Sequence, residues 1–256
     1  MDECIHGFEP GMCASCFPPP EPEKVVVKRP SKPAKTVLRT PAPGTAAAAK
    51  PEPRASNLPQ RIFHVTHVKN LPAILEAGEL LPSSEAEPAV RLSSPITGEL
   101  RETARATDAA SVLDCVAFSL SPKATWWSEV QDGAAGPTWS DQARQALAVD
   151  FVVLGVPIAS VADRLVVTDG DAAAMVTAVG ATPVEAKRML ARAALDDAVM
   201  HAAEALVPGT VPLDSVALVA VANDKRRDEV KRMLSAAGIP AKVAVYPPWF
   251  VPTPLD

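Results

Sequence analysis

Four potential metal ligands lie within the first sixteen residues of the chain. They form a C-x-H pair and a C-x2-C pair, and they are Cys4, His6, Cys13 and Cys16. A structural Zn²⁺ ion takes four nitrogen or sulfur ligands in a tetrahedron, and a C-x2-C turn supplies two of them. A segment with so few apolar residues would draw its folding energy from the metal. The spacing therefore predicts a zinc knuckle over residues 1–17; the alternative is a disordered tail with incidental cysteines.

A second group of polar residues lies in residues 61–78, RIFHVTHVKNLPAILEAG. The first eight alternate with a period of two and are rich in β-branched types, which predicts a strand. A helix with Asn70 as its N-cap is predicted to follow and to end at Gly78. His64 and Thr66 share one face of the strand, so they either bond to backbone groups in a core or form the floor of a ligand site. His67 falls on the opposite face and is expected to be structural.

Three other sets of residues are open to more than one interpretation. Residues 98–105 could form one or two helical turns, presenting Arg101 and Arg105 together at i, i+4, although each could equally lie on a solvated face. Cys115 stands alone in an apolar run, and the adjacent tryptophans at 126 and 127 fit a core or a lid over a pocket. Residues 199–208 are rich in alanine but precede a proline-bounded strand, so they fit a helix or a strand.

The elements that would position these residues follow no strict β-α-β rhythm, which predicts an α+β domain. Further strands are predicted at 112–120, 147–156, 166–168, 216–222 and 241–246, and further helices at 158–165, 171–180, 182–198 and 224–238. A buried tryptophan is expected in the terminal segment PPWFVP. The chain contains neither a G-x-G-x-x-G nor a P-loop motif, so dinucleotide-binding and P-loop folds are not expected.

Residues 18–59 form a proline-rich segment between the predicted knuckle and the predicted domain over residues 60–256. The segment holds eleven prolines and is expected to be a disordered linker. It carries eight Lys or Arg against three Asp or Glu, although the whole chain has a net charge of −5. A basic strip of this kind fits either nucleic-acid contact or an ordinary linker. The acidic N-terminus is unlike a secretion signal and no long apolar run occurs, so a cytoplasmic location is expected.

Residues 61–250 resemble the DarT family of ADP-ribosyltransferases, toxins that use NAD⁺ to modify bases in single-stranded DNA. Five motifs carry the resemblance: FHVTHV followed by N-L-P, VLDCVAF, T-D-G, AEALV and P-W-F, at residues 63–72, 112–118, 168–170, 203–207 and 248–250. The resemblance implies a fold of mixed sheets with flanking helices. It also implies single-stranded DNA as the acceptor and a macrodomain antitoxin as a partner.

The resemblance also implies roles for particular residues. Glu204 would be the catalytic glutamate that binds the ribose of NAD⁺ and stabilises the positive charge of the transition state. Arg101, or Arg105 as second choice, would be the arginine that contacts the diphosphate or the base. The residues expected to line the NAD⁺ site are His64, Thr66 and Asn70.

Three departures from the family pattern bear on the acceptor. Ala202 stands where a glutamine is common, residues 195–198 lack the usual basic residues, and Pro122-Lys123 replaces a proline-arginine pair. The NAD⁺ site is therefore better supported than the DNA site. RNA or protein as acceptor, NAD⁺ hydrolysis and a non-catalytic binding module remain the alternatives.

Overall fold

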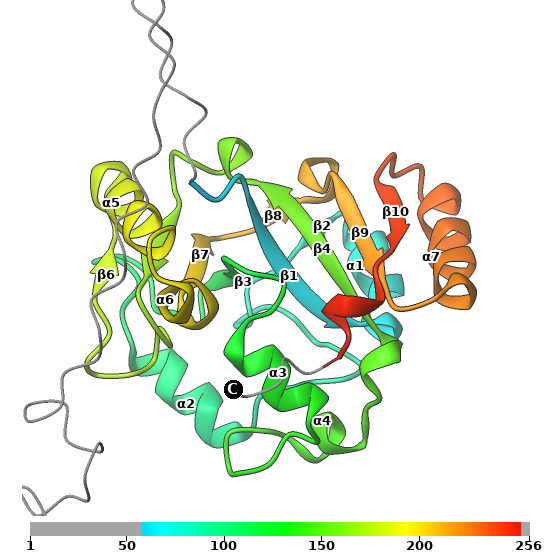
Figure 1. Cartoon of the computed structure of the whole chain (residues 1–256), viewed down its shortest axis with the longest axis horizontal. Coiled ribbons are helices and arrows are strands. Elements are labelled where there is room, and N and C mark those ends of the chain that lie inside the picture. Colours follow the sequence, from blue (N-terminus) through cyan, green and yellow to red (C-terminus); the bar gives the residue numbers. More distant parts are fainter. Residues whose placement is uncertain (1–57, 252–256) are drawn as a thin grey trace, which may run out of the picture. The chain divides into compact units, whose positions relative to one another are not determined.

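The computed structural model describes residues 58–251, which fold as a large sheet with helices packed around it (Figure 1). The predicted zinc ligands and almost all of the predicted linker lie outside this part of the chain. The strands are β1 (Arg61–His67), β2 (Glu79–Leu80), β3 (Cys115–Ser119), β4 (Phe151–Pro157), β5 (Val166–Thr168), β6 (Val179–Gly180), β7 (Glu204–Pro208), β8 (Val211–Pro212), β9 (Leu218–Val221) and β10 (Lys242–Val245). The α-helices are α1 (Leu71–Ala77), α2 (Pro95–Thr103), α3 (Thr125–Gln131), α4 (Asp141–Gln145), α5 (Pro183–Ala193), α6 (Asp197–Ala202) and α7 (Asp224–Ala236).

Within these residues, eight strands form one sheet in the order β10-β9-β4-β1-β3-β7-β5-β6, and β2 pairs with β8. Neighbouring strands of the large sheet run antiparallel, except for the parallel pair β9 and β10. This mixed arrangement confirms the α+β prediction in its general form. The order places β1 at the centre of the sheet and brings Ser119 of β3 opposite Glu204 of β7.

Both faces of the sheet are covered, and β4 is therefore buried along almost its whole length. Val152, Leu154 and Val156 belong to a core that also contains residues of α1, α5 and α7. Phe151 and Val153 point into a second core with residues of α3 and α4. A strand buried on both faces needs apolar residues at every position, as the sequence of β4 shows.

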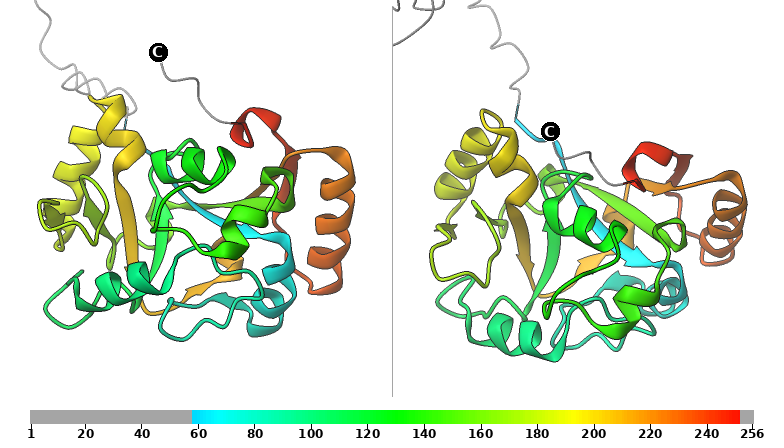
Figure 2. Two further views of the ribbon diagram at one scale, coloured as in Figure 1. Left: turned by 90° about the horizontal axis from the view of Figure 1, so that it is seen from below. Right: turned by 60° about the horizontal axis from the view of Figure 1, so that its bottom comes forward.

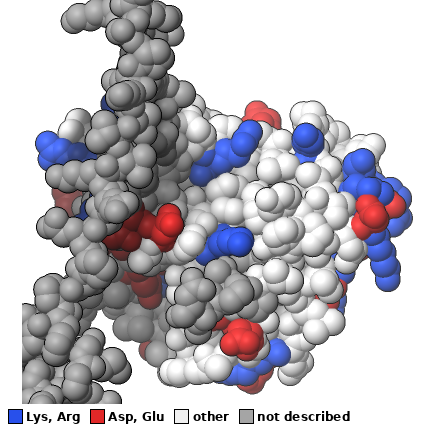
Figure 3. Space-filling model, viewed as in Figure 1, with Lys and Arg blue, Asp and Glu red and all other residues white. Residues whose placement is uncertain are grey.

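The helices begin and end largely where local signals place them. Thr182 and Glu185 form a capping box at the start of α5, and Asn223 caps α7 through the N–H of Arg226. Helix α1 ends at Gly78, whose φ of 72° is left-handed. Lys and Arg side chains gather over the outer side of α7 (Figure 3). No helix of residues 58–251 is long and apolar enough to cross a membrane.

Four predictions about the elements were wrong. Residues 171–178 form turns leading into β6 instead of a helix, because the Ala178 N–H bonds to Asp169 Oδ1 and β6 pairs with β5. The predicted helix over 182–198 is two helices, since Asp196 caps a new one. The predicted helix over 158–165 is a short 3-10 turn, Ile158–Ser160. Trp249 is only half-buried, and Phe250 is the buried aromatic of that segment.

Candidate active site

A cleft of about 580 Å³ opens beside the centre of the large sheet. Its walls come from β1, the loop 81–93, α2, α3 and the start of β7. All five residues predicted for the NAD⁺ site and for catalysis line it: His64, Thr66, Asn70, Arg101 and Glu204. The volume lies in the range of small-molecule sites in proteins. Tertiary structure thus brings together residues that lie up to 140 positions apart in the sequence.

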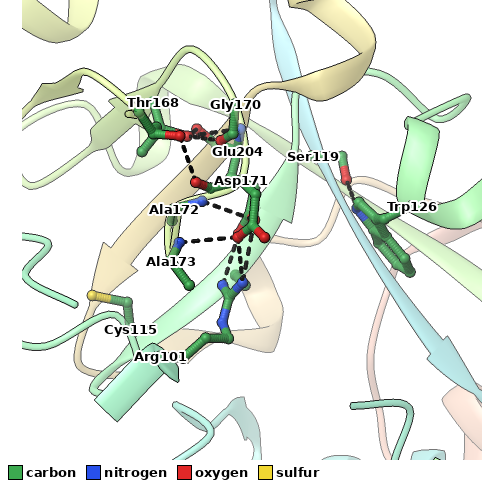
Figure 4. Close-up of polar contacts among 12 residues, drawn as sticks. Arg101, Cys115, Ser119, Trp126, Thr168, Gly170, Asp171, Ala172, Ala173 and Glu204 are labelled. Carbon is green, nitrogen blue, oxygen red and sulfur yellow. Dashed lines mark hydrogen bonds and ion pairs between the residues drawn. The ribbon is translucent and has the colours of Figure 1, made fainter. Parts of the chain in front are cut away.

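The Glu204 carboxylate is the most strongly held group of the cleft. Arg101 donates to it with both terminal nitrogens, from Nη2 to Oε2 at 2.7 Å and from Nη1 to Oε1 at 3.2 Å (Figure 4). The backbone N–H of Ala172 donates to Oε1 at 3.3 Å. Glu204 is the first residue of β7, so its backbone is fixed by pairing with Ser119. A fork of two parallel hydrogen bonds orients the carboxylate as well as binding it.

Arg101 is placed for this contact by α2, which begins at the Ser94 cap and ends at Thr103. Burial by itself would lower the pKa of the Arg101 guanidinium, but the charge and hydrogen bonds of Glu204, with Asp171, raise it above its ordinary value. Arg101 therefore stays a cation. Because the helix ends before Arg105, the expected i, i+4 pair on one helix does not form, and Arg105 is exposed outside the cleft.

The turns after β5 complete the surroundings of Glu204. The Thr168 hydroxyl accepts the backbone N–H of Glu204 at 3.1 Å and donates to the carbonyl of Gly170 at 2.7 Å. Asp171 Oδ1 lies 3.7 Å from Arg101 Nη1 (Figure 4). Sequence reasoning expected a helix here and missed the contacts of Asp171 and Ala172 with the site. The T-D-G motif was the signal that could have located them.

His64 presents a neutral imidazole to the cleft. Its Nδ1 lies 2.9 Å from the carbonyl oxygen of Ala117, which can only accept, so Nδ1 carries the proton. Burial lowers the pKa of His64 below its ordinary value, and the bond to Ala117 offsets this only in part. Nε2 is therefore an acceptor. His67, predicted to be structural, is buried against Phe151 and accepts the Lys69 N–H through Nδ1.

Asn70 stands at the N-cap position of α1, where the sequence predicted it. Its side chain makes no capping hydrogen bond to α1. Instead, Oδ1 accepts the Val90 N–H at 2.8 Å, while Nδ2 donates to Val90 O at 2.9 Å and to Thr66 Oγ1 at 3.0 Å. The amide is thus used to fix the loop of the cleft wall onto the end of β1. Asn70 and Val90 are twenty positions apart, so no pattern of neighbouring residues in the sequence predicts this contact.

Trp126 is a lining residue to which the sequence gave no definite role. Its indole Nε1–H donates to Ser119 Oγ at 2.8 Å, on the strand next to Glu204 (Figure 4). Trp127 points the other way into the core, where its indole donates to the Trp249 carbonyl. Of the two neighbouring tryptophans, one therefore belongs to the core and the other to the cleft.

Cys115 is a packing residue. Its side chain is fully buried and its Sγ donates to the Ser111 carbonyl at 3.4 Å. Burial raises the pKa of this thiol to about 11, so it carries no thiolate at neutral pH. Residues 58–251 contain no group of side chains suited to hold a metal ion. The four predicted zinc ligands lie outside the described residues.

Comparison with known proteins finds a family profile and similar solved folds. A family profile described as "ssDNA thymidine ADP-ribosyltransferase, DarT" matches residues 63–251. No curated protein gives a match. The fold is similar to that of Thermus sp. 2.9 DarT in complex with ADP-ribosylated ssDNA, at 19% identity and a TM-score of 0.64, covering 75% of this chain and 96% of that one. The same protein in complex with NAD⁺ gives 20% identity and a TM-score of 0.58, covering 75% and 97%.

A further similar structure is Thermosipho africanus DarTG in complex with ADP-ribose. It shares 17% identity with a TM-score of 0.57, covering 75% of this chain and 51% of that one. These structures support the fold, and the profile supports the family, because it spans well over half of the chain. The resemblance inferred from the five sequence motifs is confirmed: the chain belongs to the DarT family of single-stranded-DNA thymidine ADP-ribosyltransferases.

Proposed function

We propose that NAD⁺ binds in the cleft with its nicotinamide ribose beside Glu204, and that ADP-ribose passes to a thymidine base of single-stranded DNA. The observation that carries the proposal is the arrangement of Glu204, whose carboxylate is fixed by Arg101 and the Ala172 N–H at the side of a cleft of suitable size. Similar solved folds, those of Thermus sp. 2.9 DarT, are complexes with NAD⁺ and with ADP-ribosylated ssDNA.

The reaction breaks the bond between the ribose C1′ and the nicotinamide nitrogen. The bonding electrons leave with nicotinamide, so positive charge develops on the ribose. A fixed carboxylate that binds the ribose 2′-hydroxyl stabilises that charge without reorganising at the moment of reaction. A nitrogen of the base then forms the new bond to C1′ and loses its proton, so the products are the modified base, neutral nicotinamide and one proton.

Arg101 acts in this proposal as a permanent cation. Because Glu204 holds the pKa of the guanidinium above its ordinary value, Arg101 does not accept the proton of the base. Its role is to orient Glu204 and to stabilise the base as the proton leaves. His64 supplies a hydrogen-bond acceptor, the unprotonated Nε2, for a donor on NAD⁺, and Thr66 lines the same wall.

The acceptor is tested by incubating the full chain with labelled NAD⁺ and four polymers: single-stranded DNA with thymidine, the same DNA without thymidine, RNA and protein. Label is expected on the first alone. Glu204→Gln, which keeps the shape and removes the charge, is expected to lower kcat about a hundredfold or more. Glu99→Gln on the exposed side of α2 is the matched control. Label transfer that continues at full rate in Glu204→Gln would overturn the assigned mechanism.

The proposal extends to the partners and the N-terminus. A macrodomain antitoxin that reverses the modification is the partner expected for a DarT toxin. Cys4, His6, Cys13 and Cys16 are proposed to hold one structural Zn²⁺, since their types and spacing suit a tetrahedral site. The basic segment after them would then link the knuckle to the transferase domain.

A further inference from the structure

Acidic side chains outnumber basic ones along the walls of the cleft. The described residues lining it include five carboxylates, those of Glu79, Glu87, Glu129, Asp171 and Glu204, but only two arginines. One of these, Arg101, is committed to Glu204 through both terminal nitrogens. NAD⁺ carries a diphosphate with two negative charges. A cation other than Arg101 would favour the binding of this diphosphate in the cleft.

Arg91 is the other arginine of the cleft. It lines the cleft, it is exposed, and no carboxylate lies within ion-pair distance of it in residues 58–251. Within the described part of the chain, its guanidinium makes one hydrogen bond, from Nη2 to the Ala86 carbonyl at 3.3 Å. An arginine fork has five N–H donors, so most of them are available to phosphate oxygens.

The backbone at Arg91 is held from both sides. On one side, Asn70, the last residue of the 3-10 turn after β1, bonds to both the N–H and the carbonyl of Val90. On the other, the Arg91 N–H donates to Gln142 Oε1 at 2.8 Å, and Ser140 on the same segment donates to the Leu92 carbonyl. A side chain on a fixed backbone loses less entropy on binding a ligand. Both the oxygen and the nitrogen of the buried Asn70 amide are therefore used to hold the protein backbone beside Arg91 and the end of β1.

We propose that Arg91 binds the diphosphate of NAD⁺, and that Asn70 is a positioning residue that fixes the loop carrying Arg91. The inference rests on the proposed function, since it assigns the anion within the same cleft. It also changes the role of Asn70, which would act on NAD⁺ through Val90 and Arg91. The diphosphate joins the two ribose units of NAD⁺, so it must lie in the cleft between the ribose at Glu204 and the adenosine.

The test measures binding of ADP-ribose and of adenosine to the full chain by calorimetry. Arg91→Gln is expected to weaken ADP-ribose binding about ten- to a hundredfold, because a charge-assisted contact is lost. Adenosine, which has no phosphate, should bind the variant and the unaltered chain equally. Arg91→Lys should recover part of the affinity, since lysine restores the charge without the fork. Arg188→Gln on the exposed side of α5 loses the same charge away from the cleft and should bind ADP-ribose normally.

Kinetics separate this role from a catalytic one. Arg91→Gln should raise KM for NAD⁺ with little change in kcat, whereas Glu204→Gln lowers kcat. Asn70→Ala should weaken ADP-ribose binding, and adding Arg91→Gln to it should cost less than Arg91→Gln costs alone. ADP-ribose binding unchanged in Arg91→Gln would overturn the inference, as would a loss confined to single-stranded DNA binding. Neither result depends on label transfer, so failure of the proposed function is seen separately in the polymer panel.

Discussion

The Glu204 carboxylate and the Arg101 guanidinium depend on each other for their state in the cleft. Their side chains are 10% and 17% exposed, so each is largely removed from water. Removing one partner of such a pair leaves the other charge without compensation, which costs more than the pair itself contributes. At the scale of single residues, the main feature of the site is therefore the Glu204 carboxylate, which the permanently charged Arg101 guanidinium holds in one orientation.

Arg101→Gln is expected to lower both activity and stability. The Glu204 carboxylate would keep only the Ala172 N–H as a donor, so we expect kcat to fall at least about tenfold and the free energy of unfolding to fall by about 1–3 kcal/mol. Label transfer and urea unfolding measure the two effects. Arg105→Gln, with the same charge change on an exposed residue, is the control. If Arg105→Gln is the more damaging variant, the roles of the two arginines are reversed.

Stability is expected to fall below about pH 6.5, the ordinary pKa of histidine. Burial lowers the pKa of His64 and of His67 in the folded chain, so below that pH the unfolded chain binds protons that the folded chain does not. Stability therefore rises with pH up to about 6.5 and then levels off, as far as these groups contribute. His64→Gln should reduce the slope of Tm between pH 5 and 7. An unchanged slope would show that the His64 imidazole is not kept neutral by folding.

At the scale of elements, the site is assembled where the ends of several strands meet. Strand β7 begins with Glu204, and β5 leads into the turns that hold Ala172 (Figures 2 and 4). His64 comes from the middle of β1, at the centre of the sheet. The segment 169–178 is neither helix nor strand, and its position is fixed at both ends by the pairing of β5 with β6. Its apolar residues Met175 and Val176 are almost fully exposed, which a helix packed on the sheet would not allow.

Gly180→Ala tests whether β6 fixes this segment. An added Cβ would lie 2.9 Å from the Glu185 carbonyl carbon and 3.0 Å from Met189 Cγ, so β6 and α5 would have to separate. We expect a loss of about 1–3 kcal/mol in unfolding free energy and a lower kcat, since Ala172 would shift from Glu204. Gly98→Ala in α2 meets no atom within 4 Å and should be stabilising by about 0.5–1 kcal/mol. Equal stability of the two variants would contradict this packing.

At the scale of the whole chain, the family profile covers residues 63–251, and the residues of the proposed zinc knuckle lie outside the described part of the chain. The full chain is expected to bind one Zn²⁺, and Cys13→Ser should lose it, as measured by atomic absorption. Cys115→Ala is the control, because that buried thiol lies in the transferase domain. NAD⁺ should raise Tm equally with and without the metal, since a ligand of the folded cleft stabilises by mass action. A Cys13→Ser chain that keeps stoichiometric zinc would contradict the predicted ligand set.

The sequence predicted those features that are decided within a few residues. The alternation of β1, the start of α5 at Thr182 and the end of α1 at Gly78 depend on neighbouring residues and were found where expected. The five motifs also identified the family and placed Glu204 in the cleft. Where two local signals competed, as in residues 199–208, the sequence could not choose, and the chain uses both: α6 ends at Ala202 and β7 begins at Glu204.

Tertiary structure decided which side chains meet. The helix expected over 171–180 gave way because β6 pairs with β5, and a backbone with a partner strand satisfies its hydrogen bonds without a helix. The end of α2 separates Arg101 from Arg105. The Asn70 side chain bonds to Val90, twenty residues away, instead of capping α1. Such choices depend on contacts between positions remote in the chain, whereas local propensity depends only on the nearest turn. The sequence determined the family and the chemical types of the site residues; tertiary contacts determined that Arg101, and not Arg105, holds Glu204.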